Sequence, residues 1–305
     1  MKISFCCADT QPEPWLDGLR AALPEANVAL WAPGAPHADY AVVWAPPQQF
    51  FDEQTQLRGI FTIGAGVDAL LQLKLPPGVP LHRLEDAGMA VQMAEYVCHA
   101  VIRYFREFDA MAADAATGTW RQRNPRLRSE FTVGLLGLGV LGQRVAQSLR
   151  AFEFPVIGWS RKPKVLEGIR CLAGREQLPD VLAASRVLVC LLPLTPETQD
   201  ILNRQTLQQL PRGSYLVNVA RGGHLVDQDL LDLLDGGHLA GATLDVFRTE
   251  PLPREHAFWR HPKITVTPHT SARTLRAESI AQIAQKIRAM QRGEPSALVN
   301  LERGY

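Results

Sequence analysis

The sequence carries almost no net charge and has no long hydrophobic run. Its 32 Lys and Arg residues nearly cancel its 31 Asp and Glu residues, leaving a formal charge of +1 at pH 7. This balance provides no overall attraction for nucleic acid or an anionic membrane. No apolar stretch approaches the roughly 20 residues of a membrane-spanning helix, and the N-terminal "MKISFCCADT" lacks the pattern of a signal peptide. We therefore expect a cytoplasmic protein without nucleic-acid or membrane partners, in which any anion site is local.

Cysteine is scarce and follows no pattern of ligands or disulfides. The five cysteines are an odd number, and their spacing fits neither a disulfide framework nor a metal site. They lie in apolar surroundings at Cys6, Cys7, Cys98, Cys171 and Cys190. We expect buried free thiols in a reducing compartment and no bound metal.

Internal repeats and low-complexity tracts are absent too, and the remaining composition is that of a globular protein. The 305 residues, 46% of them hydrophobic, are enough for two domains with separate cores. The first hundred residues alternate Pro-rich connections with the strand-like runs "KISFCC", "DYAVVW", "RGIFTIG" and "VPLHRL". Between the first two runs, "EPWLDGLRAALP" has helical spacing. This pattern predicts a small parallel α/β domain.

The middle of the chain begins with a long helical pattern at residues 90–116. The polar, Arg-rich segment 117–130 follows, which we interpret as an exposed arm or linker, with a dimer contact as the alternative. From residue 131 onward, apolar strands alternate with helical segments, as in "FTVGLLG", "PVIGW", "RVLVCLLP", "SYLVNVA", "ATLDVF" and "ITVTPHT". Nearly continuous apolar strands of this kind predict an α/β fold with doubly wound parallel sheets. The helical pattern at 275–293 could return to the first domain.

A glycine-rich turn follows the first strand of this second half. Gly137, Gly139 and Gly142 have the G-x-G-x-x-G spacing, between a strand and an amphipathic helix. The first glycine permits the tight turn, the second lets the pyrophosphate approach, and the third lets the helix pack closely. Val140 and Leu141 open that helix, whose amides and dipole favour phosphate. The turn predicts a dinucleotide site, with a purely structural turn as the alternative.

The next strand lacks the acid that usually contacts the ribose of NAD. "PVIGWSRKPK" places Ser160, Arg161 and Lys162 where that acid is expected. A hydroxyl followed by a guanidinium and an ammonium suits a 2′-phosphate, which a carboxylate would repel. We predict NADP(H) as the cofactor, with NAD(H) as the weaker alternative; a solvated basic turn would be the structural explanation.

Polar side chains follow three later strands, whose carboxyl ends share one edge of the predicted sheet. Arg221 can bind a carboxylate and a carbonyl oxygen together, and His269 can donate a proton to that oxygen. An ionised Glu250 beside His269 would favour the imidazolium. Each residue alone could instead be a surface, loop or core residue. Together they predict reduction of a 2-oxo acid by hydride transfer.

At this point the sequence resembles the D-isomer-specific 2-hydroxyacid dehydrogenase family. The resemblance rests on "GLLGLGVLGQRVA", "LLPLTPETQDIL", "LVNVARGGHLVD", "GATLDVFRTEPLP" and "HPKITVTPHTSA", in that order. It implies that Arg221, Glu250 and His269 are catalytic, and that a Rossmann cofactor domain (99–270) is inserted in a flavodoxin-like substrate domain (1–98 and 271–305). It also implies a homodimer. The further cofactor contacts implied are Leu192, Pro193, Val219, Ala220 and Asp245, the last at the nicotinamide carboxamide.

The first domain supplies the substrate contacts that the resemblance implies. "TIGAGVDALL" is similar to the substrate loop of the family, in which the amides of Ala65, Gly66 and Val67 would receive the substrate carboxylate. The glycines could equally form a plain turn. Trp44 ends a predicted strand, where it could line the pocket or belong to the core. Arg221 and His269 would also contact the substrate.

The branch and substrate follow from local sequence. "WAPP", "WSRK" and "AVQMAEYV" resemble the glyoxylate/hydroxypyruvate reductase A branch. This resemblance implies NADPH-dependent reduction of glyoxylate to glycolate and of hydroxypyruvate to D-glycerate. Alternatives are another substrate, similar to phenylpyruvate or pyruvate, a non-catalytic dinucleotide sensor of the same fold, or oxidation of formate.

Overall fold

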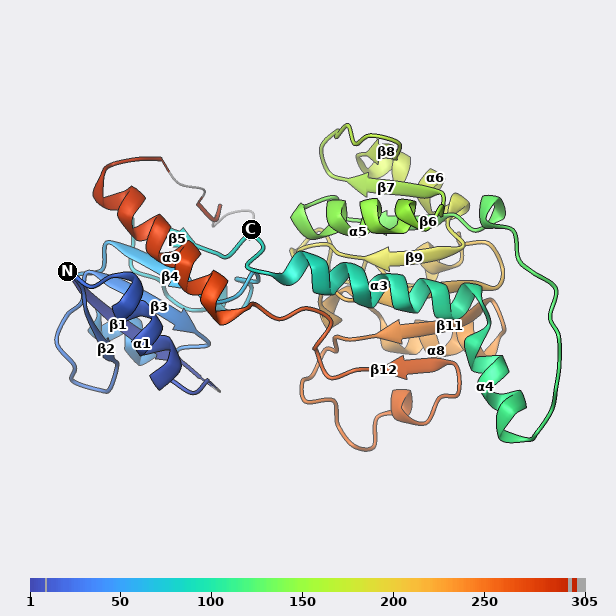
Figure 1. The fold of residues 1–305 in the computed structure, drawn as a ribbon, viewed down its shortest axis with the longest axis horizontal. Coiled ribbons are helices and arrows are strands. Elements are labelled where there is room, and N and C mark those ends of the chain that lie inside the picture. Colours follow the sequence, from blue (N-terminus) through green and yellow to red (C-terminus); the bar gives the residue numbers. More distant parts are fainter. Residues whose placement is uncertain (9, 296–297, 301–305) are drawn as a thin grey trace. The chain divides into compact units, whose positions relative to one another are not determined.

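The computed structural model describes residues 1–8, 10–295 and 298–300, and the chain forms two compact units (Figure 1). Unit 1 comprises Met1–Met89 and Arg273–Tyr305, and unit 2 comprises Ala90–Ala272. The first division falls at Met89, whereas the predicted one is at residue 98, because Met93, Val97 and Val101 pack in the core of unit 2. Residues 301–305, at the end of the predicted substrate domain, lie outside the described residues.

Unit 1 is built on one parallel sheet. Its strands have the order β2-β1-β3-β4-β5 within the described part of the chain, which is the flavodoxin-like order. Their bounds are β1 (Lys2–Cys7), β2 (Asn27–Leu30), β3 (Tyr40–Trp44), β4 (Gly59–Thr62) and β5 (Leu81–His82).

Helices cover both faces of the unit 1 sheet. α1 (Glu13–Ala22) and α9 (Arg276–Gln291) share one core with the sheet, and α2 (Gln48–Glu53) packs in the other; η1 (Leu70–Gln72) is a short 3-10 turn. In α9, Ile280, Ile283 and Ile287 recur at helical spacing and are buried. A Cβ on Gly18 of α1 would lie 2.4 Å from Ile280 Cδ1, so the two helices pack closely at this glycine. The C-terminal helix therefore belongs to the core of the N-terminal sheet.

Unit 2 is a Rossmann fold. Its described strands form one parallel sheet in the order β12-β11-β10-β9-β6-β7-β8, which extends the doubly wound order by one strand. The strands are β6 (Val133–Leu136), β7 (Val156–Ser160), β8 (Arg170–Ala173), β9 (Val187–Cys190), β10 (Ser214–Asn218), β11 (Leu239–Leu244) and β12 (Ile264–Val266). The helices are α3 (Met89–Phe105), α4 (Phe108–Ala116), α5 (Val140–Ala151), α6 (Leu178–Ala184), α7 (Arg204–Leu207) and α8 (Asp227–Asp235), with 3-10 turns η2 (Arg128–Glu130), η3 (Arg175–Gln177), η4 (Gly222–His224) and η5 (Ala257–Trp259).

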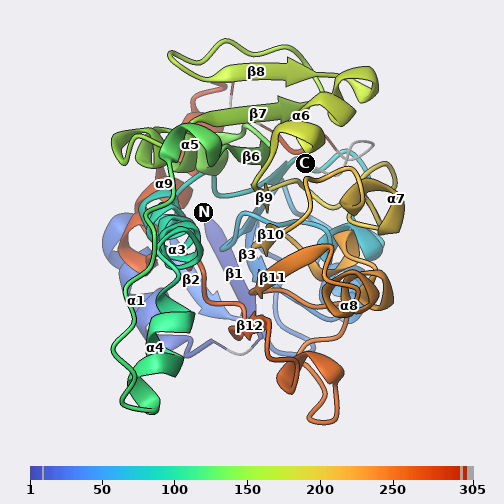
Figure 2. The ribbon, with the colours of Figure 1, turned by 90° about the vertical axis from the view of Figure 1, so that its right-hand side faces the viewer.

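The sheet of unit 2 is buried on both faces, as the continuous apolar strands predict. Figure 2 shows α3 and α5 on one face and α6, α7 and α8 on the other. Along β9, Val187 and Val189 enter the core beneath α3 and α5, while Leu188 and Cys190 enter the opposite core. The predicted fold class is thus confirmed, with two parallel sheets and a Rossmann unit.

The long helical pattern at 90–116 forms two helices. α3 ends at Phe105 and α4 begins at Phe108, because Glu107 between them has a left-handed backbone (φ 56°) that no helix can continue. Beyond α4, the chain runs as an extended arm along the outside of unit 2 before it enters β6 (Figure 1).

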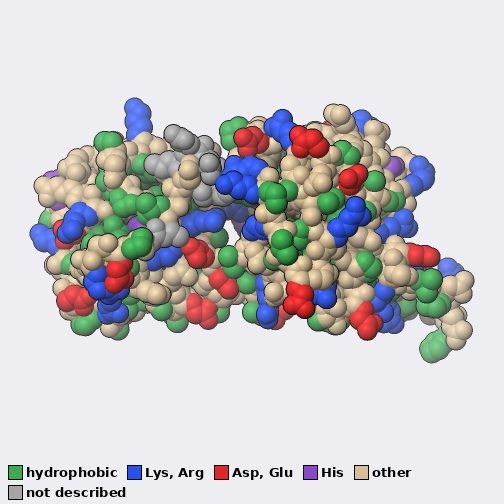
Figure 3. All heavy atoms as spheres, turned by 90° about the horizontal axis from the view of Figure 1, so that it is seen from above, with side chains coloured by type: hydrophobic (Ala, Val, Ile, Leu, Met, Phe, Trp, Pro, Cys, Tyr) green, Lys and Arg blue, Asp and Glu red, His purple; other side chains and the backbone are tan. Residues whose placement is uncertain are grey.

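Neither a metal site nor a membrane-spanning helix is found among the described residues. Lys and Arg side chains lie among Asp and Glu side chains on the face drawn in Figure 3. No group of three or more His, Cys, Asp or Glu side chains among the described residues could hold a metal ion. No described helix is long and apolar enough to cross a membrane. The five cysteines are free thiols.

Candidate active site

The glycine turn after β6 is shaped by close backbone contacts. Gly137 has φ +107°, and a Cβ there would lie 2.7 Å from the Leu191 carbonyl oxygen. A Cβ on Gly142 would lie 2.1 Å from the Gly137 carbonyl oxygen. Gly139 is different, because a Cβ there would meet no atom within 4 Å. Two glycines therefore allow the turn to pack, and the third leaves a cradle open to a ligand.

The N-terminus of α5 faces this cradle without a side-chain cap. Gly139 is its N-cap residue, and Val140 in its first turn is half exposed. The amides of a first helical turn have no partner within the helix, so they can donate to an anion. Leu141 is partly buried. The open cradle and the uncapped amides fit the pyrophosphate of a dinucleotide.

The basic segment after β7 is tied to the glycine turn. Ser160 is buried, and its hydroxyl donates to the Lys162 carbonyl at 2.8 Å, so it shapes the turn that carries Arg161 and Lys162. Both basic side chains are exposed. Lys164 Nζ donates to the Leu138 carbonyl of the glycine turn at 2.5 Å. Lys164, the third cation of "SRKPK", was not among the predicted cofactor contacts.

Two further loops are joined by a buried histidine. The ring of His224 lies between two carbonyl oxygens, with Nδ1 3.1 Å from that of Arg221 and Nε2 3.2 Å from that of Pro193. It therefore connects the loop after β9 with the loop after β10. His224 is fully buried, and no sequence pattern indicated this role for it. The neighbouring predicted cofactor contacts, Leu192, Val219 and Ala220, are also buried.

His269 and Glu250 form a hydrogen-bonded pair. His269 Nδ1 lies 2.7 Å from Glu250 Oε2, and the other oxygen, Oε1, accepts the Phe247 amide at 2.9 Å. Partial burial by itself would raise the pKa of Glu250, but the bonds from His269 and Phe247 and the charges of His269 and Arg221 outweigh it and lower that pKa. Glu250 is therefore an ionised partner that orients the ring through Nδ1, and its bond does not engage Nε2.

The segments that carry Arg221 and Glu250 pack backbone against backbone. Gly222, directly after Arg221, has no room for a side chain, because a Cβ would lie 1.8 Å from the Phe247 carbonyl carbon. Arg248 continues this contact and donates from Nε to the Leu225 carbonyl at 2.8 Å. The Arg221 guanidinium is partly held by a bond from Nη1 to the Ala220 carbonyl at 2.7 Å. Gly222 was not predicted as a site residue, since its role depends on a contact distant in sequence.

Asp245 lies beneath the turn that carries His269. It is fully buried, and its carboxylate accepts the Thr270 and Ser271 amides at 2.9 and 2.8 Å. Thr267 adds a hydroxyl at 2.5 Å. The contact with a nicotinamide carboxamide predicted for Asp245 stays a prediction; in this structure the side chain organises the turn.

Unit 1 carries the predicted substrate loop. Trp44 ends β3, and its ring covers Gly64, where a Cβ would lie 2.2 Å from Trp44 Cζ3. Trp44 is 38% exposed, so it is neither a buried core residue nor freely solvated. Within the described residues, the amides of Ala65, Gly66 and Val67 donate to no protein acceptor. Consecutive unpaired amides of this kind can bind an anion such as a carboxylate.

The chain is similar to known proteins along its whole length. The sequence model for the NAD-binding domain of D-isomer specific 2-hydroxyacid dehydrogenases matches residues 98–271. A glyoxylate/hydroxypyruvate reductase A from Serratia proteamaculans is 49% identical over 313 residues, covering 100% of both chains, and one from Yersinia enterocolitica is 45% identical at the same coverage.

Solved structures of D-isomer specific 2-hydroxyacid dehydrogenases and a related reductase are similar to this chain. A D-isomer specific 2-hydroxyacid dehydrogenase from Xanthobacter autotrophicus, in complex with NADPH and MES, superposes with a TM-score of 0.94 at 39% identity. An NADPH-dependent glyoxylate/hydroxypyruvate reductase from Sinorhizobium meliloti, in complex with NADP and sulfate, has a TM-score of 0.94 at 34% identity. Both similarities cover 100% of this chain and 99% of the other.

Proposed function

The chain belongs to the D-isomer-specific 2-hydroxyacid dehydrogenase family, and on that premise we propose that it is an NADPH-dependent reductase of glyoxylate and hydroxypyruvate. The products would be glycolate and D-glycerate. The observation that carries the proposal is the Glu250–His269 pair, joined at 2.7 Å, in the same unit as an open dinucleotide turn. An ionised acid beside an exposed imidazole is the arrangement that a proton donor to a ketone needs.

The basic segment after β7 supports NADPH as the cofactor. Arg161 and Lys162 are exposed cations at the end of the strand where NAD-binding proteins carry an acid. Lys164 holds their segment to the glycine turn through the Leu138 carbonyl. A 2′-phosphate would form charge-assisted hydrogen bonds here, whereas NADH offers only a hydroxyl. NAD(H) would therefore be the weaker cofactor.

The residues of unit 2 divide the chemistry between them. Arg221 binds the substrate carboxylate and stabilises the negative charge that develops on the carbonyl oxygen. His269 donates a proton from Nε2 to that oxygen, because Nδ1 is engaged with Glu250. In the reverse direction the neutral imidazole takes the proton back. The reduced nicotinamide, when bound, supplies the hydride to the carbonyl carbon. Asp245, Val219 and Ala220 would border its ring.

Unit 1 supplies recognition of the small acid. The amides of Ala65, Gly66 and Val67 would donate to the substrate carboxylate. Trp44, at the end of β3, packs its ring over Gly64 of this loop and would limit the size of the substituent on the 2-oxo acid. Glyoxylate and hydroxypyruvate satisfy such a limit better than phenylpyruvate.

A substrate panel tests the function. Purified protein is mixed with NADPH or NADH and with glyoxylate, hydroxypyruvate, pyruvate or phenylpyruvate, and absorbance at about 340 nm follows the cofactor. We expect the highest kcat/KM for glyoxylate and hydroxypyruvate with NADPH. Oxidation of formate with NAD⁺ would favour a formate-dehydrogenase chemistry instead. Normal NADPH binding without turnover of any substrate would favour a dinucleotide sensor.

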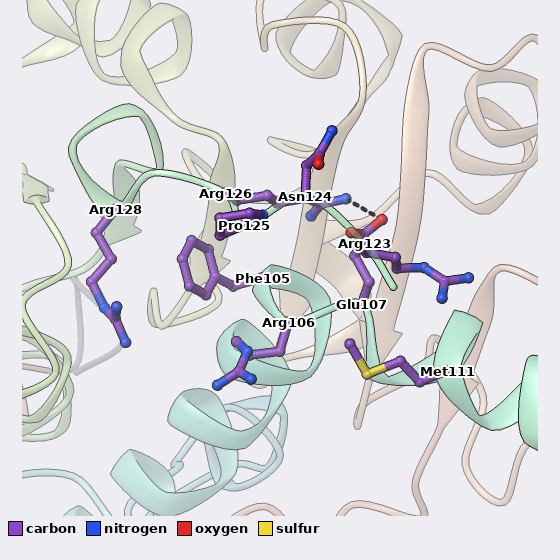
Figure 4. Close-up of a pocket in the computed structure, with 9 residues that line it drawn as sticks. All are labelled: Phe105, Arg106, Glu107, Met111, Arg123, Asn124, Pro125, Arg126 and Arg128. Atoms are coloured by element: carbon purple, nitrogen blue, oxygen red, sulfur yellow. Dashed lines mark ion pairs between the residues drawn. The ribbon is translucent and has the colours of Figure 1, made fainter. Parts of the chain in front are cut away.

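We also propose that the chain forms a homodimer through its extended arm. Trp120 on the arm is 94% exposed and Leu127 is 60% exposed, so both offer apolar side chains of the kind that protein interfaces bury. The arm borders a cavity of about 280 Å³ in which Arg126 pairs with Glu107 at 3.1 Å (Figure 4). A second copy would cover these side chains through a two-fold interface.

Light scattering after gel filtration tests the dimer. Trp120→Ser would yield a monomer, whereas Trp259→Ser, at a half-exposed tryptophan on η5, would leave the dimer intact. A monomeric parent chain, or a dimer in both variants, would contradict the assignment.

The free thiols fit a reducing compartment, and we propose the cytoplasm as the location.

A further inference from the structure

Asp245 accepts hydrogen bonds from each residue of the turn that carries His269. Three successive amides converge on it: His269 donates to its main-chain carbonyl at 2.9 Å, and Thr270 and Ser271 donate to its two carboxylate oxygens at 2.9 and 2.8 Å. They can do so because His269 has a left-handed backbone (φ 52°), which turns the following amides inward. A left-handed histidine is uncommon and persists only where its surroundings favour it.

The Asp245 carboxylate is in turn fixed by a chain of two hydroxyls. Thr267 Oγ1 lies 2.5 Å from Asp245 Oδ1 and 2.5 Å from the Tyr96 hydroxyl. Thr267 donates its single hydroxyl proton to Asp245 Oδ1, so it has no proton left for Tyr96. Tyr96 must then donate to Thr267. The direction of both bonds is therefore settled, and it runs from Tyr96 through Thr267 to Asp245.

The two hydroxyl hydrogen bonds matter because Asp245 is buried. Asp245 is fully buried. If it loses a hydrogen-bond donor, a carboxylate oxygen is left without that partner in an environment of low dielectric constant, which is unfavourable. Thr267 lies just after β12 and Tyr96 lies on α3, so the chain connects two elements across the edge of unit 2. Pro268 separates Thr267 from His269 and restricts Thr267 to extended conformations, which keeps its hydroxyl on Asp245.

We propose that Thr267 and Tyr96 are positioning residues for His269: their hydroxyls hold the Asp245 carboxylate, which holds the left-handed turn and so aims the imidazole. This inference rests on the proposed function, in which His269 moves the proton. Loss of the Thr267 hydroxyl would let Asp245 rotate, and the turn would sample other conformations. A reacting group displaced by about 1 Å can lose on the order of 100-fold in rate.

Two hydroxyl deletions and their matched controls form the first half of the test. Thr267→Val removes both hydrogen bonds, Tyr96→Phe removes the bond to Thr267 alone, and Thr267→Ser retains a hydroxyl. Thr265→Val removes a hydroxyl two residues earlier that accepts Arg103 Nη1 at 2.9 Å, and Tyr104→Phe removes the other α3 phenol, which donates to the Gly213 carbonyl. We expect kcat with NADPH and glyoxylate to fall at least about tenfold in Thr267→Val and less in Tyr96→Phe. KM for NADPH stays unchanged, and Thr267→Ser recovers most of kcat.

The second half of the test measures hydrogen–deuterium exchange of backbone amides, which does not depend on enzymatic turnover. In hydrogen–deuterium exchange of the peptide with Thr270 and Ser271, Thr267→Val exchanges at least about tenfold faster than Thr265→Val, because the acceptor of both amides has moved. A parent chain without turnover would end the proposed function, and exchange would still decide the positioning role. Unchanged exchange and kcat in Thr267→Val would overturn the inference, as would no recovery in Thr267→Ser. A rise in KM for NADPH alone would overturn it too, by assigning the chain to the cofactor.

Discussion

Replacement of Gly222 by alanine tests whether the close backbone contact behind Arg221 is needed for catalysis. The new Cβ would lie 1.8 Å from the Phe247 carbonyl carbon, and ordinary contacts begin near 3.4 Å. The difference of about 1.6 Å must be absorbed by backbone, because the nearest atoms belong to the main chain of Phe247 and Arg248. Glu250 lies in that same segment and accepts the Phe247 amide, so the displacement reaches the partner of His269.

The expected magnitudes follow from this displacement. Overpacking of this kind costs about 1–3 kcal/mol of unfolding free energy, measured by urea denaturation. A shift of about 1 Å at a catalytic group can cost on the order of 100-fold in kcat/KM, measured with NADPH and glyoxylate.

The next residue provides the matched control. The nearest atoms to a Cβ on Gly223 belong to the side chain of Leu194, at 3.0 Å, and that side chain can yield by a few tenths of an ångström. Gly223→Ala should therefore retain kcat/KM within a few fold. If Gly222→Ala retained the same activity and stability as Gly223→Ala, the reasoning from the contact would be refuted.

Three further predictions concern the cofactor and the histidine pair. Replacing Arg161 and Lys162 together by serine should lower kcat/KM with NADPH at least about tenfold and spare NADH, since each charge-assisted bond contributes about 1.5–3 kcal/mol; equal losses in steady-state kinetics with both cofactors would contradict phosphate selection. His269→Asn retains a residue that tolerates the left-handed backbone and should lower kcat by about 10²–10⁴-fold, with NADPH fluorescence titrations unchanged; retained turnover would exclude His269 as the acid. The pKa of Glu250 is lower in the folded than in the unfolded chain. The ionised carboxylate therefore stabilises the fold at pH values above its unfolded pKa, and this stabilisation is lost as the pH falls through its folded pKa. The difference in unfolding free energy between the parent chain and Glu250→Gln should thus shrink between about pH 7 and pH 3 in urea titrations, and a difference independent of pH would contradict it.

Strand prediction succeeded where a strand is buried on both faces. β6, β9 and β10 are fully buried along their length, so each appears in the sequence as an apolar run. β2 and β8 were missed. Both lie at an edge of a described sheet, and β2 buries only Val28 while β8 has no fully buried residue, so neither leaves a hydrophobic pattern.

The sequence by itself determined the class of fold, the family and the identity of the chemical groups. Apolar strands in alternation with helices require a doubly wound fold, and the glycine spacing with Arg221, Glu250 and His269 is legible because each motif is local. Only the tertiary structure decided how these groups are held. Glu250 and His269 are 19 residues apart in sequence yet bonded at 2.7 Å. Tyr96 is 171 residues from Thr267, and the hydrogen bond between their hydroxyls forms only when α3 packs near the end of β12. No local sequence pattern predicts such a bond.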